Sequence, residues 1–301
     1  MTHGADRQTT LKATLIGVLA LALWGALPAL TVTVKCLPPF EILAVTFSAA
    51  FLGGLLFLAA RGPAALRLLR QEKKAWLVAF GAIFGYHALY FYALGTVSPA
   101  TASLIAYLWP LLVVLFSATG SGERLSVRHL AGALCGLVGT AVILLLARSA
   151  PAATGTGVLA LTGYMAALLC AIIWSGYSIA NRQFGHVPSA MVVGVCGAVA
   201  IAGAACHFLL ENTVWPTSLE SSVLLLIGLG PVGAAFLFWD HATKHGMLTL
   251  LGALSYLTPL LSTLLLIVFG YTDPSWSLLL AVLLIVGGAA LAMGLPKPHP
   301  V

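Results

Sequence analysis

The chain has 301 residues, of which 60% are hydrophobic and only 7% are charged. Soluble domains carry about 25% charged residues, so this chain would expose too much apolar surface in water. The composition therefore excludes a soluble globular protein and indicates one whose solvent is the lipid bilayer.

Charged residues are rare enough to mark where the apolar segments begin and end. Stretches without Asp, Glu, Lys or Arg run over residues 13–34, 42–60, 75–122, 129–147, 149–181, 183–210, 221–239, 245–272 and 274–296. A membrane-spanning helix needs about 20 residues, so 75–122 is too long for one helix. It has a natural break where Ser98 can cap a helix and Pro99 can occupy its first position. The sequence thus predicts an all-α polytopic membrane protein with ten transmembrane helices, the first of them retained rather than cleaved as a signal.

The placement of Lys and Arg predicts the orientation of these spans. With ten spans both termini lie on one side, and that side collects twelve of the fourteen Lys and Arg residues, leaving only Lys35 and Arg148 on the other. Cytoplasmic loops carry the positive excess, so both termini are expected in the cytoplasm. The net charge of +6 is explained by this orientation, and we expect no nucleic-acid partner.

The two halves of the chain repeat each other. A shift of 149 or 150 residues superimposes the pairs Trp24/Trp174, Gly53/Gly203, Tyr107/Tyr256, Pro110/Pro259 and Gly139/Gly288. This offset predicts two five-helix units, residues 1–148 and 149–301. Because five is odd, the second unit enters the membrane inverted, and such repeats are typical of transporters whose substrate site lies at the repeat interface.

Several motifs carry a family resemblance. Leu23-Trp24-Gly25, then Pro28 and Lys35, and Gly120–Leu125 after the fourth helix resemble the EamA-type repeat of the drug/metabolite transporter superfamily. Tyr107-Leu108-Trp109-Pro110 resembles the YddG-type aromatic amino acid exporters within it. The resemblance implies a ten-helix exporter of the bacterial inner membrane, with a central cavity lined by both halves.

Four prolines are expected to kink or gate the helices. Each removes a helical hydrogen bond and leaves the carbonyl four residues earlier without its partner. In lipid that carbonyl needs a protein partner or a water-filled cavity. A cavity is the functional interpretation, and a kink satisfied by a neighbouring helix is the alternative. The residues are Pro28, Pro110, Pro231 and Pro259.

Polar-tipped aromatic residues share helix faces within the predicted spans. Buried Tyr and Trp need a partner for the O–H or N–H, and His87 is an ionisable residue inside a span. Interhelical packing, or a neutral hydrogen-bonded histidine, is the alternative. Tyr107 and Trp109 point about 200° apart on an ideal helix, so both line one cavity only if Pro110 distorts it. The candidate substrate-binding residues are Trp24, Tyr86, His87, Tyr90, Ser103, Tyr107, Trp109, Trp174, Tyr177, Trp239 and Tyr256.

The missing charges restrict the cargo. A cationic-drug exporter is expected to hold a deep carboxylate and a sugar-phosphate carrier a deep cation, and neither lies deep in a predicted span. A zwitterionic amino acid with an aromatic or apolar side chain fits best, moved outward by alternating access. A broad metabolite or drug exporter is the alternative. We interpret Asp240, His241, Lys244 and His245 as a solvated cytoplasmic loop, with a gate as the alternative.

The sequence offers little for an enzyme or a metalloprotein. It has no HExxH motif, no paired intramembrane Asp and no Ser/His/Asp constellation, and its five cysteines are scattered without a CxxC pair. His241 and His245 could bind a metal if helical, but no third ligand is evident. We therefore expect no metal and no cofactor, with amino acids and the lipid bilayer as partners. A monomer is compatible with the sequence, and both proton antiport and facilitated efflux stay open.

Overall fold

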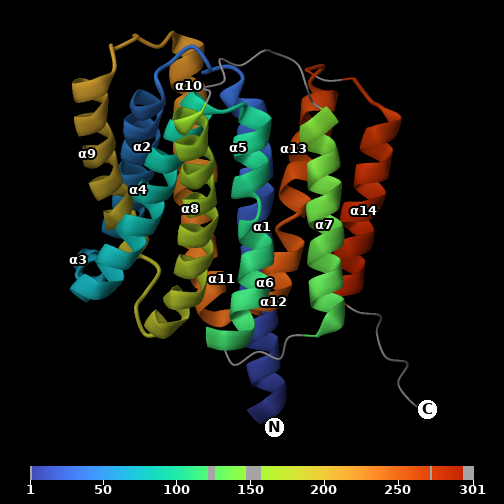
Figure 1. The fold of residues 1–301 in the computed structure, drawn as a ribbon. Helices are drawn as coiled ribbons and strands as arrows, with labels where there is room; N and C mark the ends of the chain where they lie inside the picture. The colour runs from blue at the N-terminus through green and yellow to red at the C-terminus, as the bar shows by residue number, and fades with distance from the viewer. Residues whose placement is uncertain (1, 121–125, 147–156, 272, 294–301) are drawn as a thin grey trace.

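The computed structural model describes residues 2–120, 126–146, 157–271 and 273–293, and these form helices joined by short connections, with no strand among them. The helices run nearly side by side along one axis (Figure 1). They are α1 (Thr2–Thr31), α2 (Pro39–Ala60), α3 (Pro63–Leu66), η1 (Arg67–Leu69), α4 (Lys73–Thr96), α5 (Pro99–Ala106), α6 (Trp109–Gly120), α7 (Val127–Leu146), α8 (Val158–Ala180), η2 (Asn181–Phe184), α9 (Met191–Leu210), α10 (Ser218–Ile227), η3 (Gly228–Ala234), α11 (Ala235–His245), α12 (Leu248–Leu254), α13 (Leu257–Val268) and α14 (Trp276–Met293).

The lengths of these helices suit a bilayer. Within the described residues, seven helical segments are long and apolar enough to cross a membrane, and three further apolar helices are 10–17 residues long. The prediction of an all-α polytopic membrane protein is confirmed for the described residues, while the division into ten spans stays a prediction. The break expected at Ser98 and Pro99 is also confirmed, because Ser98 Oγ accepts a hydrogen bond from the Thr101 N–H at 3.2 Å and Pro99 begins α5.

The two ends of the bundle differ in which helices begin and end there. At the terminal end α1 begins, and α11 and α14 end (Figure 1). At the opposite end α2 begins and α9 ends.

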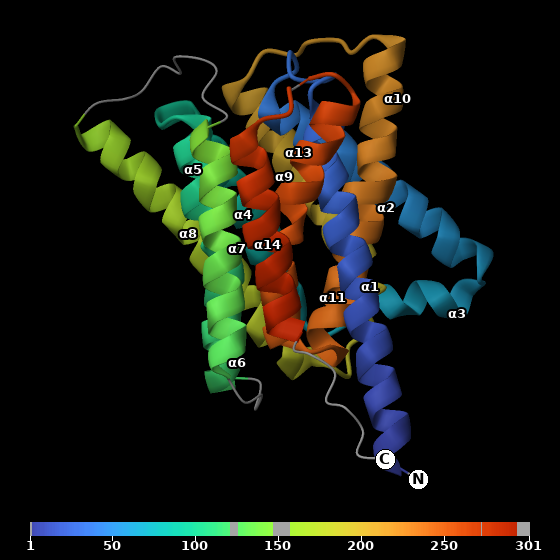
Figure 2. The ribbon, with the colours of Figure 1, turned by 90° about the vertical axis from the view of Figure 1, so that its right-hand side faces the viewer.

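Glycines permit a close approach of two helices. α7 and α14 lie side by side (Figure 2). A Cβ added to Gly132 would lie 2.5 Å from the Gly288 carbonyl oxygen, and one added to Gly288 would lie 2.6 Å from the Gly132 carbonyl oxygen. Only glycine at both positions lets the two backbones approach this closely, as at many membrane helix interfaces.

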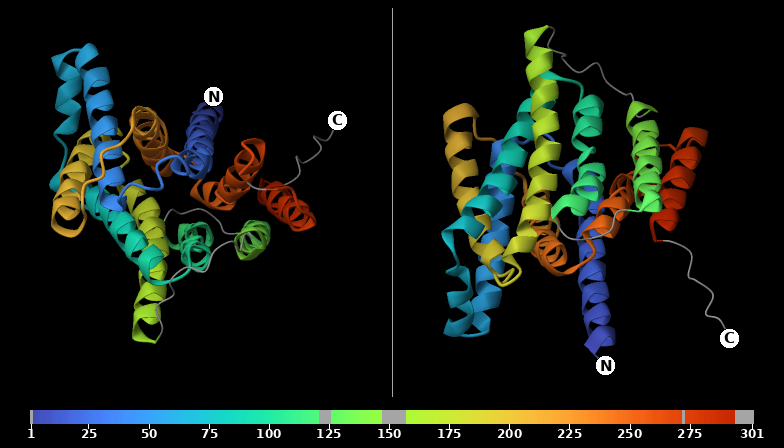
Figure 3. Two further views of the ribbon diagram at one scale, coloured as in Figure 1. Left: turned by 90° about the horizontal axis from the view of Figure 1, so that it is seen from above. Right: turned by 60° about the horizontal axis from the view of Figure 1, so that its bottom comes forward.

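Three other pairs build the rest of the bundle. α2 packs on α9, α4 on α8, and α1 on α11. Seen from above, α2 and α9 lie on one side of the molecule and α7 and α14 on the other (Figure 3). The main buried apolar cluster is shared by α1, α2, α4, α8, α9 and α11, so it lies where helices of both predicted halves meet.

Three of the four prolines lie in or beside irregular backbone, and Pro28 lies in the last turn of the continuous helix α1. Pro231 is inside η3, a stretch of π-helix. Pro110 and Pro259 are the second and third residues of α6 and α13, just after breaks that separate these helices from α5 and α12. Such interruptions of an apolar helix are frequent at functional sites.

Candidate functional site

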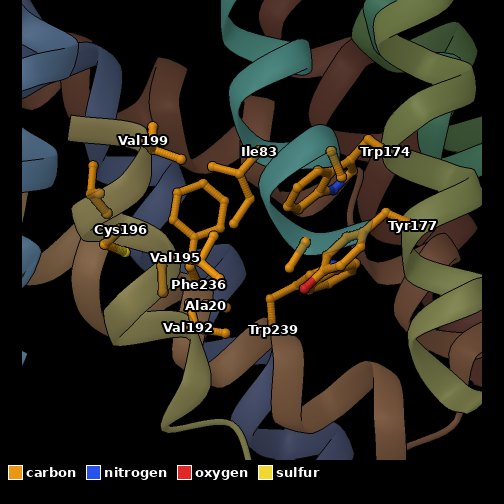
Figure 4. Close-up of a cluster of buried hydrophobic side chains, with 14 of the residues drawn as sticks. Ala20, Ile83, Trp174, Tyr177, Val192, Val195, Cys196, Val199, Phe236 and Trp239 are labelled. Carbon is orange, nitrogen blue, oxygen red and sulfur yellow. The ribbon is translucent and has the colours of Figure 1, made fainter. Parts of the chain in front are cut away.

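Four aromatic rings meet at the centre of the bundle. Trp24 of α1 lies with its ring centroid 5.7 Å from Trp174 of α8, 5.6 Å from Phe236 and 5.4 Å from Trp239 of α11. Trp174 is 5.7 Å from Phe236 and 6.4 Å from Trp239. We call these four residues the aromatic cluster. Figure 4 shows Trp174, Phe236 and Trp239 directed toward one another from two helices.

Most other predicted residues extend this cluster through ring contacts. Tyr177 lies 5.3 Å from Trp174, and Trp109 lies 5.5 Å from Trp239. Tyr86 lies 5.9 Å from Trp174 and stacks on Tyr90 at 5.8 Å. The structure thereby gathers residues of α1, α4, α6, α8 and α11 into one aromatic region, which sequence spacing alone could not demonstrate.

His87 and Ser103 join the region by hydrogen bonds and ring contacts. Ser103 Oγ hydrogen-bonds the Tyr90 hydroxyl at 2.8 Å. His87 lies 6.2 Å from Phe236, and its Nδ1 bonds the Ile83 carbonyl oxygen of the preceding turn at 2.7 Å. Because a carbonyl only accepts, Nδ1 carries a proton, which agrees with the alternative of a hydrogen-bonded histidine.

Tyr107 and Tyr256 lie at the helix breaks instead. The Tyr256 hydroxyl donates to the Tyr107 carbonyl oxygen at 3.3 Å. The Tyr256 ring is fully buried against α7, where a Cβ on Gly136 would lie 2.5 Å from the ring. α5 ends at Ala106 and α6 begins at Trp109, so Tyr107 and Trp109 do not belong to one regular helix. The angle of about 200° between their side chains, expected for an ideal helix, therefore does not apply.

Two of the three indole N–H groups of the cluster donate to protein atoms. Trp24 Nε1 donates to the Pro231 carbonyl oxygen at 3.0 Å, and Trp239 Nε1 donates to Ser178 Oγ at 3.2 Å. At the second break the Ser255 carbonyl, which Pro259 leaves without its helical partner, accepts from the Thr258 N–H at 3.1 Å. These three groups are therefore paired, as a lipid environment requires.

The loop interpretation of residues 240–245 is wrong, because they form the last turns of α11. Asp240 is 0% exposed and Lys244 is 5% exposed. Lys244 Nζ donates to Asp240 Oδ2 at 2.7 Å and to the Val187 carbonyl oxygen at 3.0 Å. Asn181 Nδ2 donates to Asp240 Oδ1 at 3.0 Å. Charged residues usually indicate a solvated segment, but an acid and a base one helical turn apart can pair and be buried together inside a helix.

The same segment holds two histidines that the sequence analysis considered as metal ligands. The His241 and His245 rings lie 4.9 Å apart, as their spacing in a helix predicts. Within the part of the chain that the structure describes, no group of three His, Cys, Asp or Glu side chains is placed to hold a metal.

A second polar network closes the opposite end. Glu211 Oε1 and Oε2 accept from the backbone N–H groups of Phe40 and Glu41 at 3.0 and 3.2 Å, at the start of α2. Glu41 Oε2 accepts from the Val214 N–H at 3.0 Å, and His207 Nδ1 bonds Glu211 Oε2 at 2.9 Å. Glu41 and His207 are buried, so this network ties α2 to the end of α9.

Sequence reasoning missed Phe236, Asn181 and the Asp240–Lys244 pair as parts of this region. Phe236 precedes Trp239 by three residues, which places both on one face of a helix. Asp240 follows Trp239 directly, and an acid and a base four residues apart are neighbours on a helix. These spacings were the available signals.

The two halves of the chain, residues 11–145 and 161–294, each match the EamA-like transporter family. The chain belongs to this family. A protein of Ancylobacter novellus named aromatic amino acid exporter YddG is 49% identical over 281 residues, which cover 93% of this chain and 96% of that protein. The protein of the same name from Escherichia coli K12 is 27% identical over 303 residues, covering 94% and 97%. A solved crystal structure is similar with a TM-score of 0.87 at 48% identity, covering 93% of this chain and 96% of that one.

These relationships fix the class of the protein. The family and its named relatives are transporters, and the apolar helices are those of a multi-pass membrane protein. The chain is therefore a membrane transport protein and not an enzyme.

Proposed function

We propose that this protein exports aromatic and other apolar amino acids across the bacterial inner membrane by alternating access. The observation that carries the proposal is the aromatic cluster, where rings from α1, α8 and α11 meet within 5.4–6.4 Å. Aromatic rings favour edge-to-face contacts with one another. The aromatic side chain of a cargo molecule can therefore make, with a ring of the cluster, the same kind of contact that the rings now make among themselves. The relatives named as aromatic amino acid exporters support the same cargo.

The proposed architecture is ten spans in two inverted five-helix units, residues 1–148 and 149–301. The seven long apolar segments and the three shorter ones found among the described residues match this number of spans. Exchange of the two units replaces α1 by α8 and α11 by α4, so the pair α1–α11 becomes α8–α4, and both pairs pack in the structure. The pairs α2–α9 and α7–α14 each join a helix to its own counterpart. This pairing is what a two-fold relationship between the halves produces.

The proposed orientation places the terminal end in the cytoplasm. α1 begins and α14 ends there, as an even number of spans requires (Figure 1). The connection between α2 and α4 at that end carries Arg61, Arg67 and Arg70, and cytoplasmic loops are enriched in such residues. An exporter in this orientation loads its cargo from the terminal end.

The candidate residues take different parts in this mechanism. We assign contact with the cargo's side chain to the aromatic cluster and to its neighbours Tyr86, Tyr90, Trp109 and Tyr177, which are joined by ring contacts. We assign bending to the breaks at Tyr107 and Tyr256, where Pro110 and Pro259 follow. The four prolines then mark where the helices flex between inward-open and outward-open forms.

The test is uptake of radiolabelled phenylalanine into liposomes that hold the purified protein. We expect uptake that tryptophan and tyrosine inhibit and that lysine and glutamate do not. Trp109→Ala should lower uptake about tenfold, because an aromatic contact worth about 1 kcal/mol is lost together with its buried area. Trp276→Ala is the matched control, since Trp276 is 87% exposed at the start of α14.

Two outcomes would contradict the proposal. Uptake of a cationic dye without uptake of phenylalanine would favour a broad drug exporter. Equal phenylalanine uptake by folded Trp109→Ala protein and wild type would remove Trp109 from the site.

A further inference from the structure

The Asp240–Lys244 pair is unusual in this molecule. Among the side chains that the structure describes, Lys244 is the only buried lysine or arginine, and it lies beside a carboxylate that is itself 0% exposed. A buried charge without a partner is strongly unfavourable, so the two residues must be ionised together or neutral together. The pair places one acid and one base next to each other in the buried interior.

The pair is attached directly to the aromatic cluster. Asp240 follows Trp239 in α11, and the Tyr177 hydroxyl donates to Asp240 Oδ1 at 3.3 Å while its ring lies 5.3 Å from Trp174. Figure 4 shows Tyr177 on α8 and Trp239 on α11, and the Trp174 ring lies 5.3 Å from the first and 6.4 Å from the second. A ligand that reaches the pair therefore also reaches the rings.

We propose that Asp240 and Lys244 bind the α-ammonium and the α-carboxylate of the transported amino acid, while the aromatic cluster binds its side chain. The inference rests on the proposed function and names the headgroup site within it. Asp240 would take the ammonium, and Lys244 would take the carboxylate.

Charge balance is the first argument for this assignment. In the structure the acid and the base satisfy each other at 2.7 Å. A zwitterion brings one group of each sign, so its ammonium replaces Lys244 at Asp240 and its carboxylate replaces Asp240 at Lys244. No net charge is buried before or after the exchange. A molecule with only one of the two charges leaves either Asp240 or Lys244 without a partner.

The surrounding groups prepare the pair for this exchange. Asn181 Nδ2 holds Asp240 Oδ1 at 3.0 Å, which orients the carboxylate and leaves Oδ2 to the cation. Lys244 reaches its partners on a flexible four-carbon stem, so its ammonium can swing toward a carboxylate nearby. The Val187 carbonyl, 3.0 Å from Nζ, gives that ammonium a second partner during the movement.

The position in the bundle agrees with the direction of transport. The pair lies on the last turns of α11, between the terminal end and the aromatic cluster. Cargo that loads from this end meets the headgroup site before the rings. Among the described residues the other buried carboxylate is that of Glu41, at the opposite end. It accepts from the Val214 N–H at 3.0 Å and lies 3.8 Å from His207 Nε2, with no buried lysine or arginine beside it.

A purely structural ion pair makes a different prediction. Lys244 would then only fasten α11 to the segment around Val187, and its loss would weaken the binding of every ligand in the same proportion. The two alternatives differ in selectivity between ligands rather than in the amount bound.

The experiment measures equilibrium binding of radiolabelled phenylalanine to purified protein, with two competitors that each lack one charge. 2-Phenylethylamine has no carboxylate, and 3-phenylpropionate has no ammonium. The wild type should prefer phenylalanine to each by roughly 10- to 100-fold, since one charged hydrogen-bonding group is missing. Asp240→Asn should shift preference toward 3-phenylpropionate, and Lys244→Met should shift it toward 2-phenylethylamine.

The control and the fallback keep the test decisive. Glu72→Gln removes an exposed acid near the same end, where Glu72 pairs with His186 at 3.3 Å, and should leave all three affinities unchanged. If a single variant does not fold, the neutral double variant Asp240→Asn/Lys244→Met replaces it and should bind the three ligands with similar affinity. Selectivity equal to that of the wild type in folded variants overturns the headgroup assignment alone. A wild type that binds no phenylalanine overturns the proposed function and this inference with it.

Discussion

The two ends of the bundle are closed by buried polar networks of different chemistry. At the terminal end one acid meets one base, Asp240 and Lys244, with side chains and one carbonyl as further partners. At the opposite end two acids, Glu41 and Glu211, accept mainly from backbone N–H groups, three in all. The second arrangement is that of anions at a helix N-terminus, which the exposed donors and the helix dipole stabilise.

The difference bears on the headgroup site that we propose at the terminal end. At the opposite end the acids bond backbone N–H groups and His207, and among the described residues no lysine or arginine is buried beside them to take a ligand carboxylate, so we interpret this network as the connection between α2 and α9. Side-chain charges at the terminal end can change partners while the helix stays intact. The terminal network is also bonded to the aromatic cluster through Tyr177. Variants at the terminal end should therefore change both stability and ligand preference, whereas variants at the opposite end should change stability alone.

The largest expected effect on stability is at Lys244. Lys244→Met leaves Asp240 buried without its cation, which should lower the free energy of unfolding by about 3–5 kcal/mol. The double variant Asp240→Asn/Lys244→Met removes both charges and should recover most of that loss. Chemical denaturation in detergent micelles measures both values. A double variant no more stable than Lys244→Met would show that the ion pair itself, not the orphaned charge, matters.

An intermediate effect is expected at Glu211. Glu211→Gln replaces a carboxylate that accepts from two backbone N–H groups, and charged hydrogen bonds are worth about 1.5–3 kcal/mol. Hydrogen exchange at the Phe40 and Glu41 amides should become faster, as mass spectrometry of the α2 peptide can measure. The variant should keep the preference for phenylalanine over its singly charged analogues. A changed preference would assign the opposite end a part in cargo selection and break the comparison.

Charge spacing, caps and prolines made much of the fold predictable from the sequence. The break at Ser98 and Pro99 followed from local chemistry that the structure reproduces. The aromatic candidates followed from helical faces, and ring contacts join eight of the eleven, with Ser103 bonded to them through Tyr90. Local rules succeed where the deciding partner lies within a few residues along the chain.

The remaining features depended on partners far away in the sequence. Asp240 and Lys244 were assigned to a solvated loop, because counting charges along the chain does not show that the two residues neutralise each other inside a helix. Tyr256 was matched to Tyr107 by the repeat, yet its ring lies against Gly136 of α7, a neighbour that no periodicity reveals. Phe236 carries no polar tip and so did not stand out among other apolar residues.

The smallest expected effect is at Tyr177, which joins the terminal network to the cluster. Tyr177→Phe removes only the hydroxyl that donates to Asp240 and keeps the ring against Trp174, so it should cost about 0.5–1.5 kcal/mol of stability. Asp240 Oδ1 still accepts from Asn181, which keeps the loss small. Tyr92→Phe is the matched control, because its hydroxyl bonds Thr162 on an exposed surface. Combined with Asp240→Asn in a double-mutant cycle, Tyr177→Phe should add little further loss, since its partner has already changed. Full additivity of the two losses would mean that Tyr177 acts through its ring alone, and that the headgroup pair and the aromatic cluster are energetically separate.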